Sequence, residues 1–209
     1  MKKLLITYIL FNICILLGYA DSIQKYIVTI QPQSLLYHGL KFDLEKHIKH
    51  KFATVVSPML GIYKPNLDDF STDEQPYTDL KVLGSEFTAK FYTSNREAFY
   101  LFASALYHHY WLEYQSYSWE SQIFDGNETL IPIPAYVTQN IDKLGLSLGI
   151  GGSFYGEENF VIDSYFGFGA RMSIYSSKTD IQYYFPESIF DFGYSGQTMI
   201  FGIRIGVML

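Results

Sequence analysis

Residues 160–175, FVIDSYFGFGARMSIY, carry two different surfaces in one alternating run. One set of alternate positions is almost entirely apolar and includes Phe166 and Phe168, whereas the other holds glycines, tyrosines, Asp163 and Arg171. A period of two indicates a β-strand, because successive side chains of a strand point to opposite faces. The second face lacks the Lys, Glu and Thr of a solvated sheet. The run is therefore typical of a transmembrane β-barrel strand, with lipid on one side and a crowded polar lumen on the other.

Alternation of this kind recurs along the chain and predicts eight strands. Residues 83–91, 144–151 and 199–209 also set apolar side chains against glycine and polar residues. Clusters of turn-forming residues separate these runs, as in antiparallel sheets. The predicted strands are residues 24–31, 34–46, 51–64, 80–93, 97–114, 138–154, 159–175 and 199–209. Both faces of 97–114 are apolar or aromatic, so the pattern does not say which of them faces the lumen.

The connections between the predicted strands alternate between short and long. Turns near 47–50, 94–96 and 155–158 are short, the turn at Pro32 is tight, and the other connections are long, at residues 65–79, 115–137 and 176–198. Bacterial barrels have short periplasmic turns and longer extracellular loops. The sequence therefore predicts an all-β fold, an eight-stranded antiparallel up-and-down transmembrane β-barrel with both termini in the periplasm.

Aromatic residues gather near both ends of the predicted strands and predict two interfacial girdles. Those beside the short turns are Phe91, Tyr92, Phe99, Tyr100, Phe154, Tyr155 and Phe160, and those toward the long loops are Tyr63, Tyr107, Tyr110, Trp111 and Tyr175.

The N-terminus has the features of a cleaved signal peptide. Lys2 and Lys3 precede an apolar run of about 14 residues, too short for the ~20 that span a bilayer, and Gly18 and Ala20 supply small residues for cleavage. We therefore expect residues 1–20 to be removed, leaving a barrel domain of 21–209 located in the cell outer membrane. Removal takes away the only cysteine and two lysines, so the net charge changes from −6 to −8.

Two passages resemble a known superfamily. Residues 32–45 and the run 163–171, DSYFGFGAR, resemble a poorly characterised branch of the small eight-stranded bacterial outer-membrane β-barrels. The resemblance implies the fold and carries no catalytic residue. The alternating C-terminal strand 199–209 is also similar to the signal read by barrel assembly machinery. The expected partners are that machinery, outer-membrane lipid, lipopolysaccharide and an unknown surface ligand; the acidic net charge argues against nucleic acid.

Charged residues on the predicted polar faces form a candidate network inside the lumen. They are Lys41, Asp43, Glu45, Glu86, Lys90, Asp163, Arg171 and Arg204. A basic side chain facing lipid near the midplane would cost about 2–4 kcal/mol, so these residues should point inward. Buried charges need partners, and the lumen of an eight-stranded barrel is narrow enough for side chains to fill it. The sequence predicts a closed, charge-paired lumen, with Asp163 and Arg171 each neutralised by neighbouring strands; a narrow conducting pore is the alternative.

The long connections carry most of the negative charge together with many aromatic residues. This composition suits recognition or adhesion at the cell surface, or simple solvation above the lipid, and no run matches a calcium-binding loop. The predicted function is therefore a non-enzymatic outer-membrane barrel without cofactor or metal. A secreted soluble barrel that binds a small apolar ligand is a further alternative.

Histidines give the remaining candidates. His47 and His50 lie in a predicted lysine-rich turn and lack the additional ligands that a metal requires. His108 and His109 lie near the predicted outer girdle but have no serine two positions further on. The enzymatic alternative is a lipid-A-modifying hydrolase or acyltransferase, with Ser116 or Ser118 as nucleophile only if the chain bends.

Overall fold

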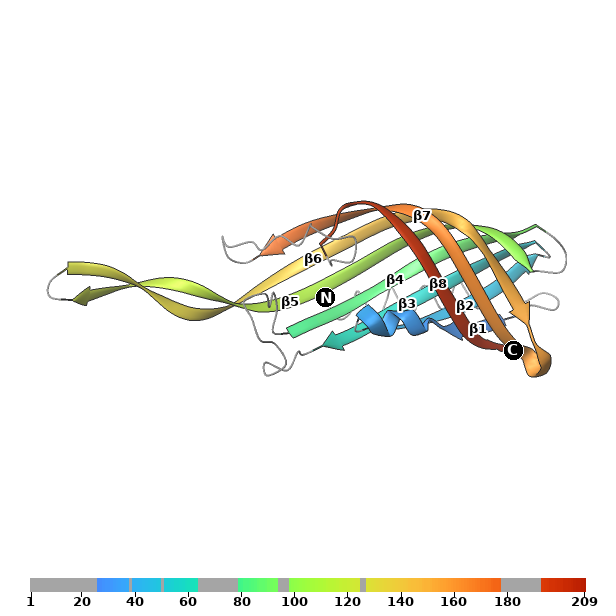
Figure 1. Ribbon diagram of the computed structural model, residues 1–209, viewed down its shortest axis with the longest axis horizontal. Helices are drawn as coiled ribbons and strands as arrows, with labels where there is room; N and C mark the ends of the chain where they lie inside the picture. The colour runs from blue at the N-terminus through green and yellow to red at the C-terminus, as the bar shows by residue number, and fades with distance from the viewer. Residues whose placement is uncertain are drawn as a thin grey trace.

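The chain folds as an eight-stranded antiparallel barrel in which each strand pairs with the next and β1 closes against β8 (Figure 1). The computed structural model describes residues 26–37, 39–49, 51–63, 79–93, 98–124, 127–177 and 193–209. The predicted fold class is confirmed. The predicted signal peptide lies outside the described residues.

The strands follow one another in order around the barrel. They are β1 (Tyr26–Ile30), β2 (Gly39–Lys49), β3 (Phe52–Tyr63), β4 (Asp79–Tyr92), β5 (Phe99–Phe124), β6 (Asn127–Tyr155), β7 (Phe160–Ser177) and β8 (Gly196–Met208). Two 3-10 helices accompany them, η1 (Pro32–Tyr37) and η3 (Glu157–Asn159). Among the described residues, no helix is long and apolar enough to cross a membrane.

Side chains alternate between the lumen and the outer surface along each strand. On β7, Asp163 is 2% exposed and Phe168 is 60% exposed, as the opening run predicts. The faces of β5 are now assigned as well: Tyr100 and Phe102 are buried inside, and Leu101 between them faces out. The outer surface is an apolar band whose half-exposed or more exposed members include Leu60, Ile62, Phe87, Leu101, Leu146, Leu148, Ile150, Phe168 and Phe201.

The aromatic residues predicted for the girdles divide between the two faces. Phe91, Phe99 and Phe154 are exposed on the outer wall at the end that carries the short turns. Tyr92 and Tyr100, their chain neighbours, are 0% and 1% exposed and point into the lumen. Alternation along the strand, and not closeness to the membrane boundary, decides the position of these tyrosines.

The start of the second predicted strand is wrong. The prediction placed a strand from residue 34 directly after a tight turn at Pro32, but Pro32–Tyr37 is the 3-10 helix η1 and β2 begins at Gly39. Proline suits the first turn of a helix because its missing N–H has no helical partner there. The Ser34 hydroxyl donates to the Gln31 carbonyl and accepts from the Lys41 amide, which holds η1 against the edge of β2.

The prediction that residues 115–137 form a loop is also wrong, because most of them extend two strands. β5 runs to Phe124 and β6 begins at Asn127, and the pair is in continuous register from Phe99–Gly152 to Phe124–Asn127. The resulting hairpin projects far beyond the other described elements, at the end of the barrel opposite the short turns (Figure 1). Most of the predicted loops 65–79 and 176–198 lies outside the described residues.

Candidate functional site

The lower lumen, next to the short turns, is crossed by a continuous network of buried ion pairs. β2 directs Lys41, Asp43 and Glu45 inward from alternate positions, and β4 does the same with Glu86 and Lys90. β7 and β8 add Asp163 and Arg204, which face each other in register. The barrel thus places in its lumen seven of the eight residues that the sequence suggested. Asp43, Glu45, Lys90, Asp163 and Arg204 form the network, and Lys41 and Glu86 form a separate pair.

Lys90 joins acids from two different walls. Its Nζ lies 2.6 Å from Glu45 Oε2 and 2.9 Å from Asp163 Oδ2, and it sits 4.3 Å from the centre of the Tyr100 ring. Lys90 is 1% exposed, so these contacts replace its hydration completely. Such a charge is tolerated in a protein interior only when it is paired and hydrogen-bonded.

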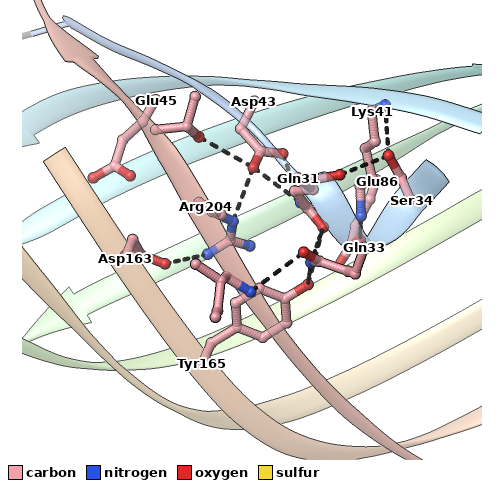
Figure 2. Close-up of polar contacts among 12 residues, drawn as sticks. Gln31, Gln33, Ser34, Lys41, Asp43, Glu45, Glu86, Asp163, Tyr165 and Arg204 are labelled. Atoms are coloured by element: carbon pink, nitrogen blue, oxygen red, sulfur yellow. Dashed lines mark hydrogen bonds and ion pairs between the residues drawn. The ribbon is translucent and has the colours of Figure 1, made fainter. Parts of the chain in front are cut away.

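Arg204 completes the bridge between β2 and β7 (Figure 2). Its Nε lies 2.9 Å from Asp43 Oδ2 and its Nη1 lies 2.9 Å from Asp163 Oδ1. The guanidinium is stacked 4.2 Å from the ring centre of Tyr165. Because Arg204 is anchored to both carboxylates, its side chain is fixed across the lumen rather than free to move.

Neutral donors complete the coordination of the Glu45 and Asp163 carboxylates. Tyr92 donates to Glu45 at 2.7 Å, Tyr100 donates to Asp163 at 2.7 Å, and Ser153 donates to Asp163 at 2.8 Å. These donors matter because Asp43, Glu45 and Asp163 outnumber Lys90 and Arg204 by one charge. Sequence reasoning missed them: the two tyrosines were expected in a girdle.

The segment after β1 extends the network toward η1 (Figure 2). Gln31 Nε2 donates to both oxygens of Asp43 at 2.9 Å, and Gln31 Oε1 accepts from the Tyr165 hydroxyl at 3.0 Å. Gln33 Nε2 donates to Gln31 Oε1 at 3.1 Å, and Gln33 Oε1 accepts from the Ile203 amide at 3.4 Å. η1 is thereby connected to the β8 wall as well as to β2.

A separate ion pair lies on the side of the network that faces the hairpin. Lys41 Nζ contacts Glu86 Oε2, which joins β2 to β4. Ser104 and Ser147, at a distance of 2.5 Å, make the corresponding polar contact between β5 and β6. Both contacts lie between inward-facing side chains of the barrel wall.

Arg171 lies apart from this network. Among the described residues no acidic side chain forms an ion pair with it, and its buried Nε has no hydrogen-bond partner there. Its inward-facing neighbourhood includes Lys143, which is 4% exposed and stacked 5.4 Å from the ring centre of Tyr110. The partner expected for Arg171 from neighbouring strands is not present in the part of the chain that the structure describes.

Packed side chains fill the lumen on both sides of the Lys41–Glu86 pair. Near the turns, one buried cluster consists of Ala53, Tyr92, Tyr100 and Phe102. Toward the hairpin, a second consists of Met59, Leu80, Val82, Tyr110, Leu112 and Ile141. Glycine on the adjacent strand makes room for the rings: Gly151 on β6 pairs with Tyr100, and a Cβ at Gly151 would overlap the Tyr100 ring.

The two adjacent histidines do not form one site. His108 faces the lumen, where its Nδ1 lies 3.3 Å from the Tyr110 hydroxyl. His109 faces outward, and its Nδ1 lies 2.6 Å from Asp142 Oδ1, which also accepts from the Tyr107 hydroxyl. A hydrolase would need a nucleophile at His109 Nε2, and no described residue makes a hydrogen bond to that atom.

His47 lies on β2 and not in a turn, 3.0 Å from Glu45, while His50 lies outside the described residues. Within the described part of the chain, no group of three or more His, Cys, Asp and Glu side chains is arranged to hold a metal.

Comparisons with known proteins add little beyond the chain's own architecture. No family model and no curated protein matches the sequence. Among solved structures, crystal structures of Acinetobacter baumannii CarO and CarO2 are similar. CarO is 12% identical over 90% of this chain and 98% of CarO, with a TM-score of 0.40; CarO2 is 9% identical over 88% and 97%, with a TM-score of 0.41. Structural similarity at these TM-scores does not support an inference about fold or function. The fold and the site are therefore assigned from the strands and contacts of this chain.

The barrel itself indicates where the protein resides. In the closed ring each strand of the wall pairs with a neighbour on both sides, and the outer surface is an apolar band. Only helices and closed barrels satisfy their backbone groups inside lipid. An even number of antiparallel strands with short turns at one end is the architecture of bacterial outer-membrane barrels. The protein resides in the outer membrane.

Proposed function

We propose that this protein is a non-enzymatic outer-membrane barrel with a closed lumen, and that it acts by recognition through its extracellular hairpin. The observation that carries the proposal is the buried network of Lys90 and Arg204, which ties opposite walls of the lumen together. A conducting pore needs a continuous water-filled path, whereas here ion pairs and two packed clusters occupy the interior.

The apolar outer surface argues against a secreted soluble barrel. A secreted barrel in water would not expose Ile62, Leu146 and Phe201 at 72%, 69% and 72%. An apolar surface of this extent is typical of contact with lipid or with a partner. The band surrounds the strands, as the hydrocarbon core of a bilayer requires.

The hydrolase alternative has one observation in its favour, the His109–Asp142 pair on the outer wall. A carboxylate that orients a histidine is common in hydrolases. The same contact, shared with Tyr107, also serves as a polar anchor beside Trp111 at the membrane boundary. With no described nucleophile at His109, the pair supports anchoring better than catalysis.

We predict that the refolded protein shows no steady single-channel conductance in a planar lipid bilayer. The reason is that Lys90 and Arg204 span the lumen, so that ion passage would require breaking several buried charge contacts. Correct folding is verified first by heat-modifiable mobility in gel electrophoresis. Reproducible current steps from the folded fraction would contradict the closed lumen.

We predict that chymotrypsin added to intact cells cleaves the protein within 114–124. This segment contains Tyr114, Tyr117, Trp119 and Phe124, all suitable cleavage sites, and belongs to a hairpin that projects beyond the barrel. The fragments are identified by mass spectrometry. Cleavage that requires prior permeabilisation of the outer membrane would place the hairpin on the wrong side and refute the proposed function.

A further inference from the structure

Beyond the barrel wall, the hairpin is a two-stranded ribbon. The last β5 residue that pairs with β4 is Glu113, and the first β6 residue that pairs with β7 is Gln139. Above these points β5 and β6 pair only with each other among the described residues, over roughly 35 Å of strand. Each strand of the ribbon therefore has an outer edge whose backbone groups face away from its partner.

The outer edge of β6 is blocked by proline. The Ser153 amide donates to the Ala98 carbonyl, which fixes the alternation so that even-numbered β5 residues exchange backbone hydrogen bonds with β6. Pro132 and Pro134 lie opposite the odd-numbered Trp119 and Tyr117, at positions whose amide nitrogen faces outward. Proline on an outward-facing edge removes donors that another strand would need, a known protection against edge-to-edge pairing.

The outer edge of β5 has no such protection. The same alternation directs the N–H and C=O groups of Tyr117, Trp119 and Ser121 away from β6. The segment from Tyr114 to Ile123 contains no proline and no lysine. The two edges of one ribbon are thus unequal: one lacks donors and the other presents a regular row of donors and acceptors.

The charge of the ribbon has a single sign. Residues 114–137 include Glu120, Asp125 and Glu128 and contain no Lys, Arg or His. Ser121 donates to Glu128 across the strands, so this carboxylate is held in place. An extended chain that adds to the β5 edge would lie beside Glu120, with Glu128 one strand further away, and basic side chains would complement these acids.

We propose that the β5 edge from Tyr114 to Ile123 binds an extended, cationic segment of another protein by strand addition. The segment runs antiparallel to β5, which is the more stable ladder. The proposal rests on the proposed function, because it requires the hairpin to be extracellular.

A second copy of this chain fits the edge less well. Two barrels in one membrane have the same orientation, so a two-fold axis along the membrane normal would bring two β5 edges together in parallel. It would also bring together the described acids of both ribbons, Glu120 and Glu128. Like charges at an interface are unfavourable.

The test uses the refolded full chain in detergent micelles and fluorescent dodecapeptides, measured by anisotropy. Alternating Lys-Thr is the cationic strand former, alternating Lys-Pro has the same charge but too few donors for a ladder, and alternating Glu-Thr has the opposite charge. We expect Lys-Thr to bind, and the other two to bind at least about tenfold more weakly. Equal binding of Lys-Thr and Lys-Pro, or no binding of Lys-Thr, would overturn the proposal.

A matched pair of variants tests the edge itself. Tyr117→Pro removes an outward-facing N–H that β6 does not use, just as Pro134 does on the opposite strand. Tyr117→Ala loses the same side chain and keeps the N–H. We expect Tyr117→Pro to weaken Lys-Thr binding about tenfold and Tyr117→Ala less than about threefold. Equal effects of the two substitutions would overturn strand addition. Chymotrypsin cleavage on intact cells is measured separately, so failure here with a cleavable hairpin refutes the edge and not the proposed function.

Discussion

Replacing Arg204 by methionine is expected to lower the free energy of unfolding by about 3–5 kcal/mol, the usual cost of breaking a buried ion pair from one side. Arg204 is 4% exposed and contacts both Asp43 and Asp163 at 2.9 Å. Without it, Asp43 has no described cationic partner and Asp163 retains only Lys90. Methionine replaces the aliphatic part of the side chain and lacks the guanidinium, so the loss is mainly electrostatic. Urea unfolding in lipid vesicles, followed by gel mobility, measures the change.

The matched control removes the orphaned charges together with the cation. In the triple variant Arg204→Met, Asp43→Asn and Asp163→Asn, the amides retain some hydrogen bonding, and Lys90 still pairs with Glu45. We expect the triple variant to recover most of the lost stability, because a buried pair costs most when only one partner is removed. A single Arg204→Met variant within about 1 kcal/mol of wild type would show that water reaches the network and that the lumen is not sealed.

The fold was predictable because alternation is a local property. In β4, β7 and β8 the alternation of apolar and polar residues indicates which residues face lipid. Repetition of this pattern along the chain predicts the barrel. β5 does not, since Phe102 and Leu101 are equally apolar. Its orientation depends on the neighbouring strand: Gly151 on β6 leaves space for Tyr100, so the even-numbered residues face the lumen. Glycines at alternate positions of an adjacent strand were the available signal.

The two errors in the element boundaries concern segments that contain proline. Pro132 and Pro134 fall within the predicted loop 115–137, yet both sit on an outer edge where a strand tolerates them. The sequence Asp125–Gly126 is a strong signal for a two-residue hairpin turn, and the described pairing of β5 with β6 ends on either side of it, at Phe124–Asn127. Pro32 was read as a tight turn, whereas it starts a 3-10 helix.

The sequence predicted which charged residues face the lumen, but it did not predict which of them form ion pairs with one another. Alternation places Lys90 and Asp163 on inner faces, but β4 and β7 are not neighbours, and their contact depends on the diameter and stagger of the closed barrel. The cross-strand pair Asp163–Arg204 depends on the register of β7 and β8 in the same way. No local pattern contains this information.

Gly206→Val is expected to prevent closure of the barrel. Among the described residues, β1 and β8 pair from Ile27–Met208 to Ile30–Ile205, the shortest ladder between neighbouring strands there. A Cβ at Gly206 would collide with the Val28 carbonyl oxygen and the Thr29 Cα, which are backbone atoms of β1 and cannot yield without breaking this ladder. Overpacking typically costs about 1–3 kcal/mol and occasionally more, and here it acts against backbone atoms where few hydrogen bonds hold the ring together. The expected result is loss of the heat-modifiable band on refolding into vesicles.

Gly152→Val is the control for this substitution. Gly152 lies on the outward face of β6, between Ile150 and Phe154, and the nearest atoms to its Cβ are 3.3–3.6 Å away. Valine there extends toward lipid and favours the strand, so the variant should refold like wild type. If Gly206→Val also refolds with normal yield and mobility, β1 must be able to shift along β8. In that case the ion-pair network, through Arg204 and Asp43, and not the β1–β8 ladder, would hold the barrel closed.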